Sequence, residues 1–134
     1  MRLLRTLLAV VCILACATDF GHAAQQYVQS KPLTELIRVA PAPVKDRPEV
    51  QTPIITWGGD IATIFANGNA AKTTPDSIFG KAGLKLNLVR IDDFTKQVEL
   101  FMSGDMPFLR GTMGMINMAS EVLSKDPRTK PVVI

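Results

Sequence analysis

Residues 53–68 carry the clearest pattern of apolar and polar positions in the chain. An apolar run at Pro53–Trp57 stops at the pair Gly58-Gly59, and Asp60 then opens a run whose apolar residues recur at helical spacing. This pattern predicts a buried strand, a glycine turn and a helix over Asp60–Ala66. Gly68, which follows an asparagine, is typical of a left-handed helix end. Ligands of open α/β sheets bind beyond the carboxyl ends of strands, so this junction is a candidate site.

The next residues repeat the alternation of helix and strand. Pro75 suits the first turn of a short helix over Asp76–Ala82, and Gly83 suits its left-handed end. Lys85–Ile91 alternates between apolar and polar positions and predicts a second strand. A third helix is expected over residues 92–103, and its acidic start suits the positive end of a helix dipole. Its predicted apolar face comprises Phe94, Val98, Phe101 and Met102.

The remaining residues predict one more helix between two short strands. Met106–Arg110 is expected to form a third strand that starts at a sheet edge, because Pro107 has no N–H group. Met113–Ser124 is expected to form a fourth helix, with Thr112 as its N-cap. Pro131–Ile134 is apolar and predicts a fourth strand. The predicted buried face of the fourth helix comprises Met113, Ile116, Ala119 or Ser120, and Leu123.

These elements predict the α/β class, with alternating strand–helix units and a mostly parallel sheet. In a right-handed series of such units, the strand-to-helix junctions lie at one edge of the sheet. We call this edge the rim. It would present an aromatic ring, freed backbone N–H groups, a hydroxyl and a guanidinium, and these groups suit a small polar or anionic solute. The residues we expect to bind it are Trp57, Gly58 and Gly59 after the first strand, and Arg110, Gly111 and Thr112 after the third.

Three of these side chains also have a purely structural interpretation. Trp57 at the end of a strand equally fits core packing. Arg110 equally fits an ion pair with Asp92 or Asp93. Thr112 fits a helix cap, a role that still leaves its hydroxyl at the rim.

The chain before residue 53 divides into two parts. Met1–Ala23 has a positive start, an apolar stretch too short to span a bilayer, and small residues at its end, which are typical of a cleaved signal peptide. The alternative is cleavage before Cys16, because Ile13–Cys16 resembles the lipobox of bacterial lipoproteins and would give a lipid-anchored protein. Three prolines among charged residues predict that residues 24–52 form a flexible linker.

Composition excludes several classes of function for the mature chain. Removing Arg2, Arg5 and Asp19 with the signal lowers the formal net charge from +3 to +2, and the two signs interleave, which argues against nucleic-acid binding. Both cysteines and the single histidine leave with the signal, so serine–histidine and cysteine–histidine catalysis and a zinc site are disfavoured. The glycines at 58 and 59 lack the third glycine of a dinucleotide fingerprint. We therefore expect neither an enzyme nor a cofactor.

The order of motifs is similar to that of a known family. A W-G-G-D turn at 57–60, a D-D-F helix start at 92–94 and S-G-D at 103–105 lead through an apolar segment to R-G-T at 110–112. Together with the exported start, this order resembles the opening lobe of bacterial ABC-transporter solute-binding proteins of the nitrate/sulfonate/taurine-like class. The resemblance implies a type II periplasmic-binding fold, whose two α/β lobes close over a solute and deliver it to a membrane permease.

The resemblance covers residues 53–134, which would form only an incomplete solute-binding lobe, the first part of lobe 1. We therefore expect a periplasmic solute-binding component of an uptake system, present as an N-terminal piece. The alternative from another class is an envelope-anchored interaction protein, either a lipoprotein through Cys16 or an OmpA-like fusion. A truncated, non-functional fragment is the third hypothesis. Nitrate, sulfonates, phosphate-like anions and pyrimidine precursors all fit the predicted rim.

Overall fold

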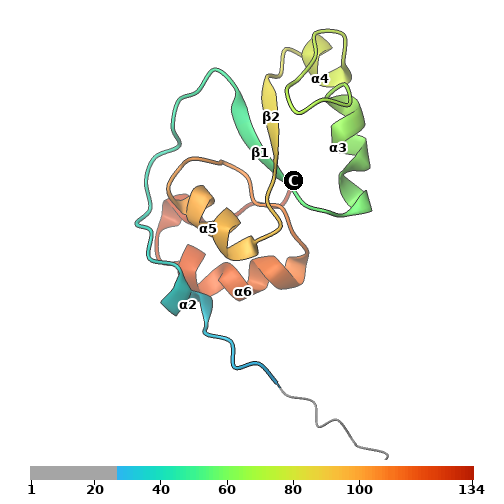
Figure 1. The fold of residues 1–134 in the computed structure, drawn as a ribbon. Helices are drawn as coiled ribbons and strands as arrows, with labels where there is room; N and C mark the ends of the chain where they lie inside the picture. The colour runs from blue at the N-terminus through green and yellow to red at the C-terminus, as the bar shows by residue number, and fades with distance from the viewer. Residues whose placement is uncertain (1–26) are drawn as a thin grey trace, which may run out of the picture. The chain divides into compact units, whose positions relative to one another are not determined.

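Two parallel strands, β1 (Val50–Ile54) and β2 (Leu86–Arg90), form the sheet of the computed structural model, which describes residues 27–134. Thr52 lies opposite Leu88 at the centre of their register. Helices follow each strand along the chain, so the structure confirms the α/β class (Figure 1). The expected signal peptide and Cys16 lie outside the described residues.

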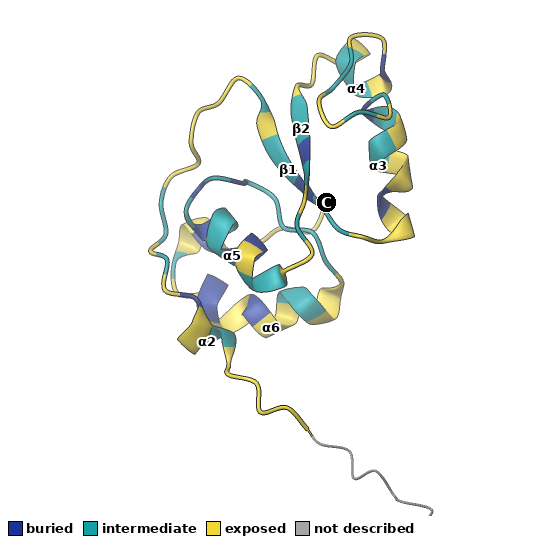
Figure 2. Cartoon of the chain, viewed as in Figure 1, coloured by how far each residue is buried: buried dark blue, intermediate teal, exposed yellow. Residues whose placement is uncertain are grey.

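The crossover from β1 to β2 contains two short helices, α3 (Ile61–Ala66) and α4 (Ile78–Lys81). Gly68 and Gly83 end them with positive φ angles, as predicted. Between the helices, the chain returns to β2 and forms an antiparallel bridge at Lys72 on its second edge. Both edges of β2 are therefore occupied. Figure 2 shows that α3 carries many exposed positions, so its packing contributes little to the core.

The outer edge of β1 is protected from pairing by two features. Val50 donates its N–H to Lys85 and Ile54 accepts from Ile91, so the even positions of β1 face β2. The odd positions face outward, where Pro53 has no N–H to offer. The next outward N–H, on Ile55, donates to a carboxylate oxygen of Asp60 at 2.9 Å. Unpaired strand edges favour aggregation, and these features leave few donors there.

The hydrophobic core lies between α5 (Phe94–Met102) and α6 (Met113–Leu123). Asp93 and Thr112 cap the two helices by accepting backbone N–H groups with their side chains, and both caps relieve unpaired donors of the first turn. The predicted face of α5 is confirmed. On α6, Met113 is exposed and Val122 is buried instead. The core cluster consists of Ile37, Val98, Met102, Ala119, Val122 and Leu123.

Residues 31–49 belong to this packed unit, which differs from the expected flexible linker. The short helix α2 (Leu33–Leu36) contacts α6, and Ile37 is 7 % exposed within the core. The expected domain start near Pro53 is therefore too late. The proline-rich composition predicts an extended backbone correctly, but it carries no information about the α5–α6 surface that this segment covers.

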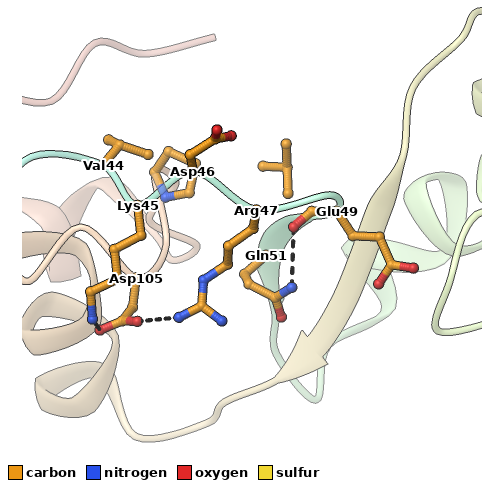
Figure 3. Close-up of a pocket in the computed structure, with 9 residues that line it drawn as sticks. Val44, Lys45, Asp46, Arg47, Glu49, Gln51 and Asp105 are labelled. Carbon is orange, nitrogen blue, oxygen red and sulfur yellow. Dashed lines mark hydrogen bonds and ion pairs between the residues drawn. The ribbon is translucent and has the colours of Figure 1, made fainter.

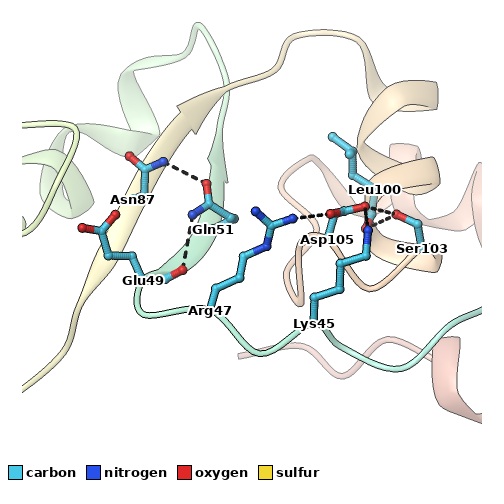
Figure 4. A network of polar contacts seen from close by, with 8 residues as sticks. All are labelled: Lys45, Arg47, Glu49, Gln51, Asn87, Leu100, Ser103 and Asp105. Carbon is cyan, nitrogen blue, oxygen red and sulfur yellow. Dashed lines mark hydrogen bonds and ion pairs between the residues drawn. The ribbon is translucent and has the colours of Figure 1, made fainter.

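The strap, which we define as residues 38–49, is fixed to the end of α5. Ala42 donates its N–H to the carbonyl of Met102 and Lys45 donates its N–H to that of Gly104, both at 2.8 Å. The side chains of Lys45 and Arg47 both bond Asp105, at 2.7 and 2.5 Å (Figure 4). The hydroxyl of Ser103 donates to the same carboxylate at 2.8 Å. This network holds an otherwise irregular segment in place.

Two predicted strands are wrong, and the first strand is shifted. Met106–Arg110 is an irregular segment: Met106 donates its N–H to the carbonyl of Leu100, and Arg110 donates its N–H to the side chain of Gln97, so neither group enters a ladder. Pro131–Ile134 is exposed and not in a strand in the described part of the chain. The first strand ends at Ile54, not at Trp57. Apolar runs predict burial, but a strand also needs a neighbour with free backbone groups.

We predict that Gly104→Ala destabilises the protein by about 3 kcal/mol or more, measured by urea unfolding of the full chain. Gly104 has a φ of 71°, and an added Cβ would lie 2.0 Å from the carbonyl oxygen of Pro43 in the strap. Gly83→Ala is the matched control, since its φ is 75° but a Cβ there meets open space. The control should lose only about 1–2 kcal/mol. Equal losses would show that the strap does not press on Gly104.

Candidate functional site

The guanidinium of Arg110 lies over the ring of Trp57, with 4.9 Å between its central carbon and the ring centroid. The segment after β1 and the segment before α6 therefore meet, as the predicted rim requires. Trp57 is 55 % exposed, so its ring is accessible from solvent and is not core packing. A cation over an indole face is attracted by the ring quadrupole, which stabilises this arrangement.

Asp60 forms an ion pair with Arg110. One oxygen of its carboxylate accepts from Nε of Arg110 in a very short contact, and the other accepts the N–H of Ile55. Asp60 is only 2 % exposed, whereas the Arg110 side chain is 28 % exposed. A buried charge must be paired, so this ion pair fixes the guanidinium on one side. The sequence places Asp60 there because the turn Gly58–Asp60 is a tight 3₁₀ turn.

Gly59 allows the Trp57 ring to approach the backbone. A Cβ at this position would lie 2.6–2.9 Å from three ring carbons of Trp57. A larger residue would therefore displace the ring from its present position. Gly58, by contrast, has open space around it, so the fold does not require a glycine there for steric reasons.

A buried glutamine connects the other two junctions. Gln97 of α5 is fully buried; its amide nitrogen donates to the carbonyl of Ile91 at 2.7 Å, and its amide oxygen accepts the N–H of Arg110 at 2.9 Å. Ile91 follows β2, and Arg110 precedes α6. Gln97 therefore replaces, with one side chain, the strand pairing that we expected at Met106–Arg110.

Asp92 ties the junction after β2 to the segment after β1. Its carboxylate accepts both the N–H and the hydroxyl of Thr56, at 2.5 and 2.8 Å. Both bonds lower the pKa of Asp92 below its usual value, and the bond from the Thr56 backbone has the larger effect. The nearby Arg90, 3.7 Å away, acts in the same direction. Asp92 therefore adds a negative charge to the rim at neutral pH.

The structure brings some of the predicted site residues together and assigns others structural roles. Trp57 and Arg110 are in contact, and Gly59 lies against the Trp57 ring. Thr112 caps α6, and Gly111 lies near Met115 of that helix. The expected ion-pair partners of Arg110, Asp92 or Asp93, are wrong, and its partner is Asp60.

Two residues that build this candidate site, Asp60 and Gln97, are absent from the sequence prediction. Asp60 was interpreted only as the start of a helix, a role that an exposed residue could fill. Gln97 was not considered, although a polar residue directly before Val98 on the apolar side of a predicted helix is an unusual position. A polar side chain is buried only when it has hydrogen-bond partners, so the position of Gln97 in the helix is the signal that could have identified it.

Two shallow depressions lie elsewhere on the described structure. One, of about 310 Å³, is lined by strap residues together with Val50, Gln51, Asp105 and Pro107 (Figure 3). Its two cations, Lys45 and Arg47, both bond Asp105 and so already hold the strap in place. The other, of about 330 Å³, is lined by Pro48, Glu49, Thr73, Lys85 and Leu86. Neither includes Trp57 or Arg110, and we consider the charged, open rim the better candidate.

Metal binding and membrane spanning find no support in residues 27–134. No group of three or more His, Cys, Asp or Glu residues in this range could hold a metal ion. No helix in the same range has the length and apolar character needed to cross a bilayer.

Comparison with known proteins finds no matching family model, no matching curated protein and no matching solved structure.

We predict that Gln97→Leu destabilises the protein by about 2–3 kcal/mol, because the carbonyl of Ile91 and the N–H of Arg110 would both lose their partner. Urea unfolding measures this loss. Gln51→Leu is the control, since Gln51 also bonds two groups but lies at the partly exposed edge of β1. The control should lose less than about 1 kcal/mol. Similar losses for the two variants would argue against a special role for Gln97.

We predict that Asp105→Asn flattens the loss of stability between pH 5 and pH 2. Hydrogen bonds from Lys45 and Ser103, with Arg47, lower the pKa of Asp105 from 3.8 to about 2. The ionised form therefore stabilises the folded state above pH 4, and this contribution is lost as the pH falls towards 2. Urea midpoints measured across this range test the expectation.

Asp126→Asn is the control for that experiment. The pKa of Asp126 is also lowered to about 2, but its partner Arg128 is only two residues away. A pair this close in sequence can persist in the unfolded chain. Its removal should therefore change the pH dependence of stability between pH 5 and pH 2 less than Asp105→Asn does. If Asp105→Asn leaves the wild-type slope intact, the strap is not held by this carboxylate.

Proposed function

We propose that the Trp57–Arg110 rim captures a small polar or anionic solute, and that the chain acts as a solute-binding component of an uptake system. The observation that supports this most strongly is the arginine held over an exposed indole ring at the meeting point of separate loops. Arginine binds oxyanions with parallel hydrogen bonds, and a fixed guanidinium loses less entropy when it does so.

The geometry leaves one part of Arg110 for a ligand. Within residues 27–134, its side chain contacts Asp60 through Nε and Trp57 through its face. The two terminal amino groups form the remaining edge of the guanidinium, which is partly exposed. A planar or tetrahedral oxyanion would bind end-on to that edge and lie beside the indole ring. This mode uses two of the six residues that the sequence predicted, Trp57 and Arg110.

The wider role rests on the sequence pattern. Export to the periplasm, possession of a second lobe and delivery to an ABC-type permease are what the resemblance implies, and we propose them together as one function. The rim would supply one wall of a cleft in such a protein. The further proposal that the site is part of lobe 1 of a type II periplasmic-binding fold is consistent with the α/β class.

The single tryptophan of the chain provides a direct test, because Trp57 lies in the proposed site. Nitrate, methanesulfonate, sulfate and orotate, added to the full chain, should change the Trp57 fluorescence for at least one ligand, with saturation. Arg110→Ala should then weaken that binding about 10- to 100-fold, which corresponds to the loss of a charged hydrogen bond.

Arg128→Ala is the control for the arginine variant. It removes an arginine that is also paired with an aspartate but has no contact with Trp57 among the described residues. Its binding constants should match those of the wild type. If no solute changes either the fluorescence or the melting temperature, or if Arg110→Ala binds normally, the proposed function is wrong.

A further inference from the structure

The charge of Arg110 is already compensated inside the protein. Asp60 contacts the guanidinium at Nε, and its carboxylate is buried, so solvent screens it poorly. The pair has no net charge, although the exposed edge of Arg110 keeps its hydrogen-bond donors. If Arg110 binds a solute, as the proposed function on which this inference rests requires, this compensation affects which charge on the solute is accepted.

Other charges around the rim do not restore a positive field. Asp92 carries a lowered pKa and lies on Thr56, next to the tryptophan segment. Asp93 lies beside it as the cap of α5. Arg90, which pairs with Asp92 at 3.7 Å, compensates one of these two charges. The groups in and next to the rim therefore sum to a net negative charge.

Two energy terms depend differently on the charge of a bound anion. The attraction to the guanidinium and the repulsion from Asp60 both grow in proportion to that charge. The free energy needed to remove the anion from water grows with its square in the Born treatment. When attraction and repulsion nearly cancel, doubling the charge gains little attraction and greatly increases the desolvation penalty. A compensated arginine thus favours a ligand with one negative charge over a ligand with two.

We propose that Asp60 is the specificity-determining residue of the rim, and that it excludes doubly charged oxyanions. Asp60 touches no solute in this arrangement; it acts through Arg110, by charge compensation from a buried position. Phosphate-like dianions, which the sequence leaves among the candidates, are thereby disfavoured. A group with one negative charge, including a zwitterion whose cation meets Asp92, remains suitable.

The first test uses the wild-type chain and needs no variant. Methanesulfonate and sulfate have similar tetrahedral shapes but carry one and two negative charges at neutral pH. Titrations followed by Trp57 fluorescence at constant ionic strength should give binding about tenfold tighter, or more, for methanesulfonate. Equal binding, or tighter binding of sulfate, would overturn the role of Asp60.

The second test removes the compensating charge. Asp60→Asn keeps the size of the side chain and one acceptor oxygen, and it should tighten sulfate binding about tenfold more than methanesulfonate binding. Asp126→Asn makes the same change of net charge at a carboxylate that pairs with Arg128 instead, and it should leave both affinities unchanged. An unchanged preference in folded Asp60→Asn would also overturn the proposal. If that variant does not fold, the wild-type comparison decides.

The outcomes separate this inference from the proposed function. Anion binding that Arg110→Ala weakens, but that shows no preference between the two probes, would retain the site and reject the role of Asp60. Absence of any fluorescence or melting response to all probes would reject the site itself, and the specificity argument with it.

Discussion

The buried carboxylate of Asp60 is the constraint on which the candidate site depends. A charge that is 2 % exposed is stable in the folded protein only if strong partners replace water, and its partners come from two distant segments. It accepts the N–H of Ile55, which protects the outer edge of β1, and it accepts Nε of Arg110, 50 residues away. The segments after β1 and before α6 therefore cannot be placed independently of each other.

Helix α5 supplies the second set of constraints. The side chain of Gln97 forms hydrogen bonds with the backbone of Ile91 and Arg110. Val98 and Met102 form the core with α6. At its carboxyl end, Gly104 receives the strap at a distance that only a glycine permits. The strap, the core and the rim thus all meet this nine-residue helix. A single helix can contact all three because each contact uses a different group: apolar side chains for the core, the buried amide of Gln97 for the rim, and carbonyl groups at its carboxyl end for the strap.

Local signals in the sequence predicted the helices well. Asp93 and Thr112 cap α5 and α6, and Gly68 and Gly83 end α3 and α4, because capping and left-handed ends need only residues close in the chain. The strands were predicted less well. Apolar runs identified β2 correctly but also suggested strands near Met106 and Val132 that are not present in residues 27–134. Strand formation depends on a partner, and the sequence pattern does not specify one.

The sequence by itself determined that Trp57 and Arg110 would each lie in a segment that leads into a helix, and the resemblance it suggests stays a prediction. Only the tertiary structure decided what these residues contact. The sequence pattern offered Asp92 and Asp93 as partners of Arg110, but Arg110 pairs with Asp60, because that carboxylate is buried and needs a charged partner. Likewise, the strap is packed because α5 and α6 present an apolar face to it and Asp105, which follows α5, pairs with its cations. Burial and partner choice arise from contacts between distant residues, which periodicity along the chain does not encode.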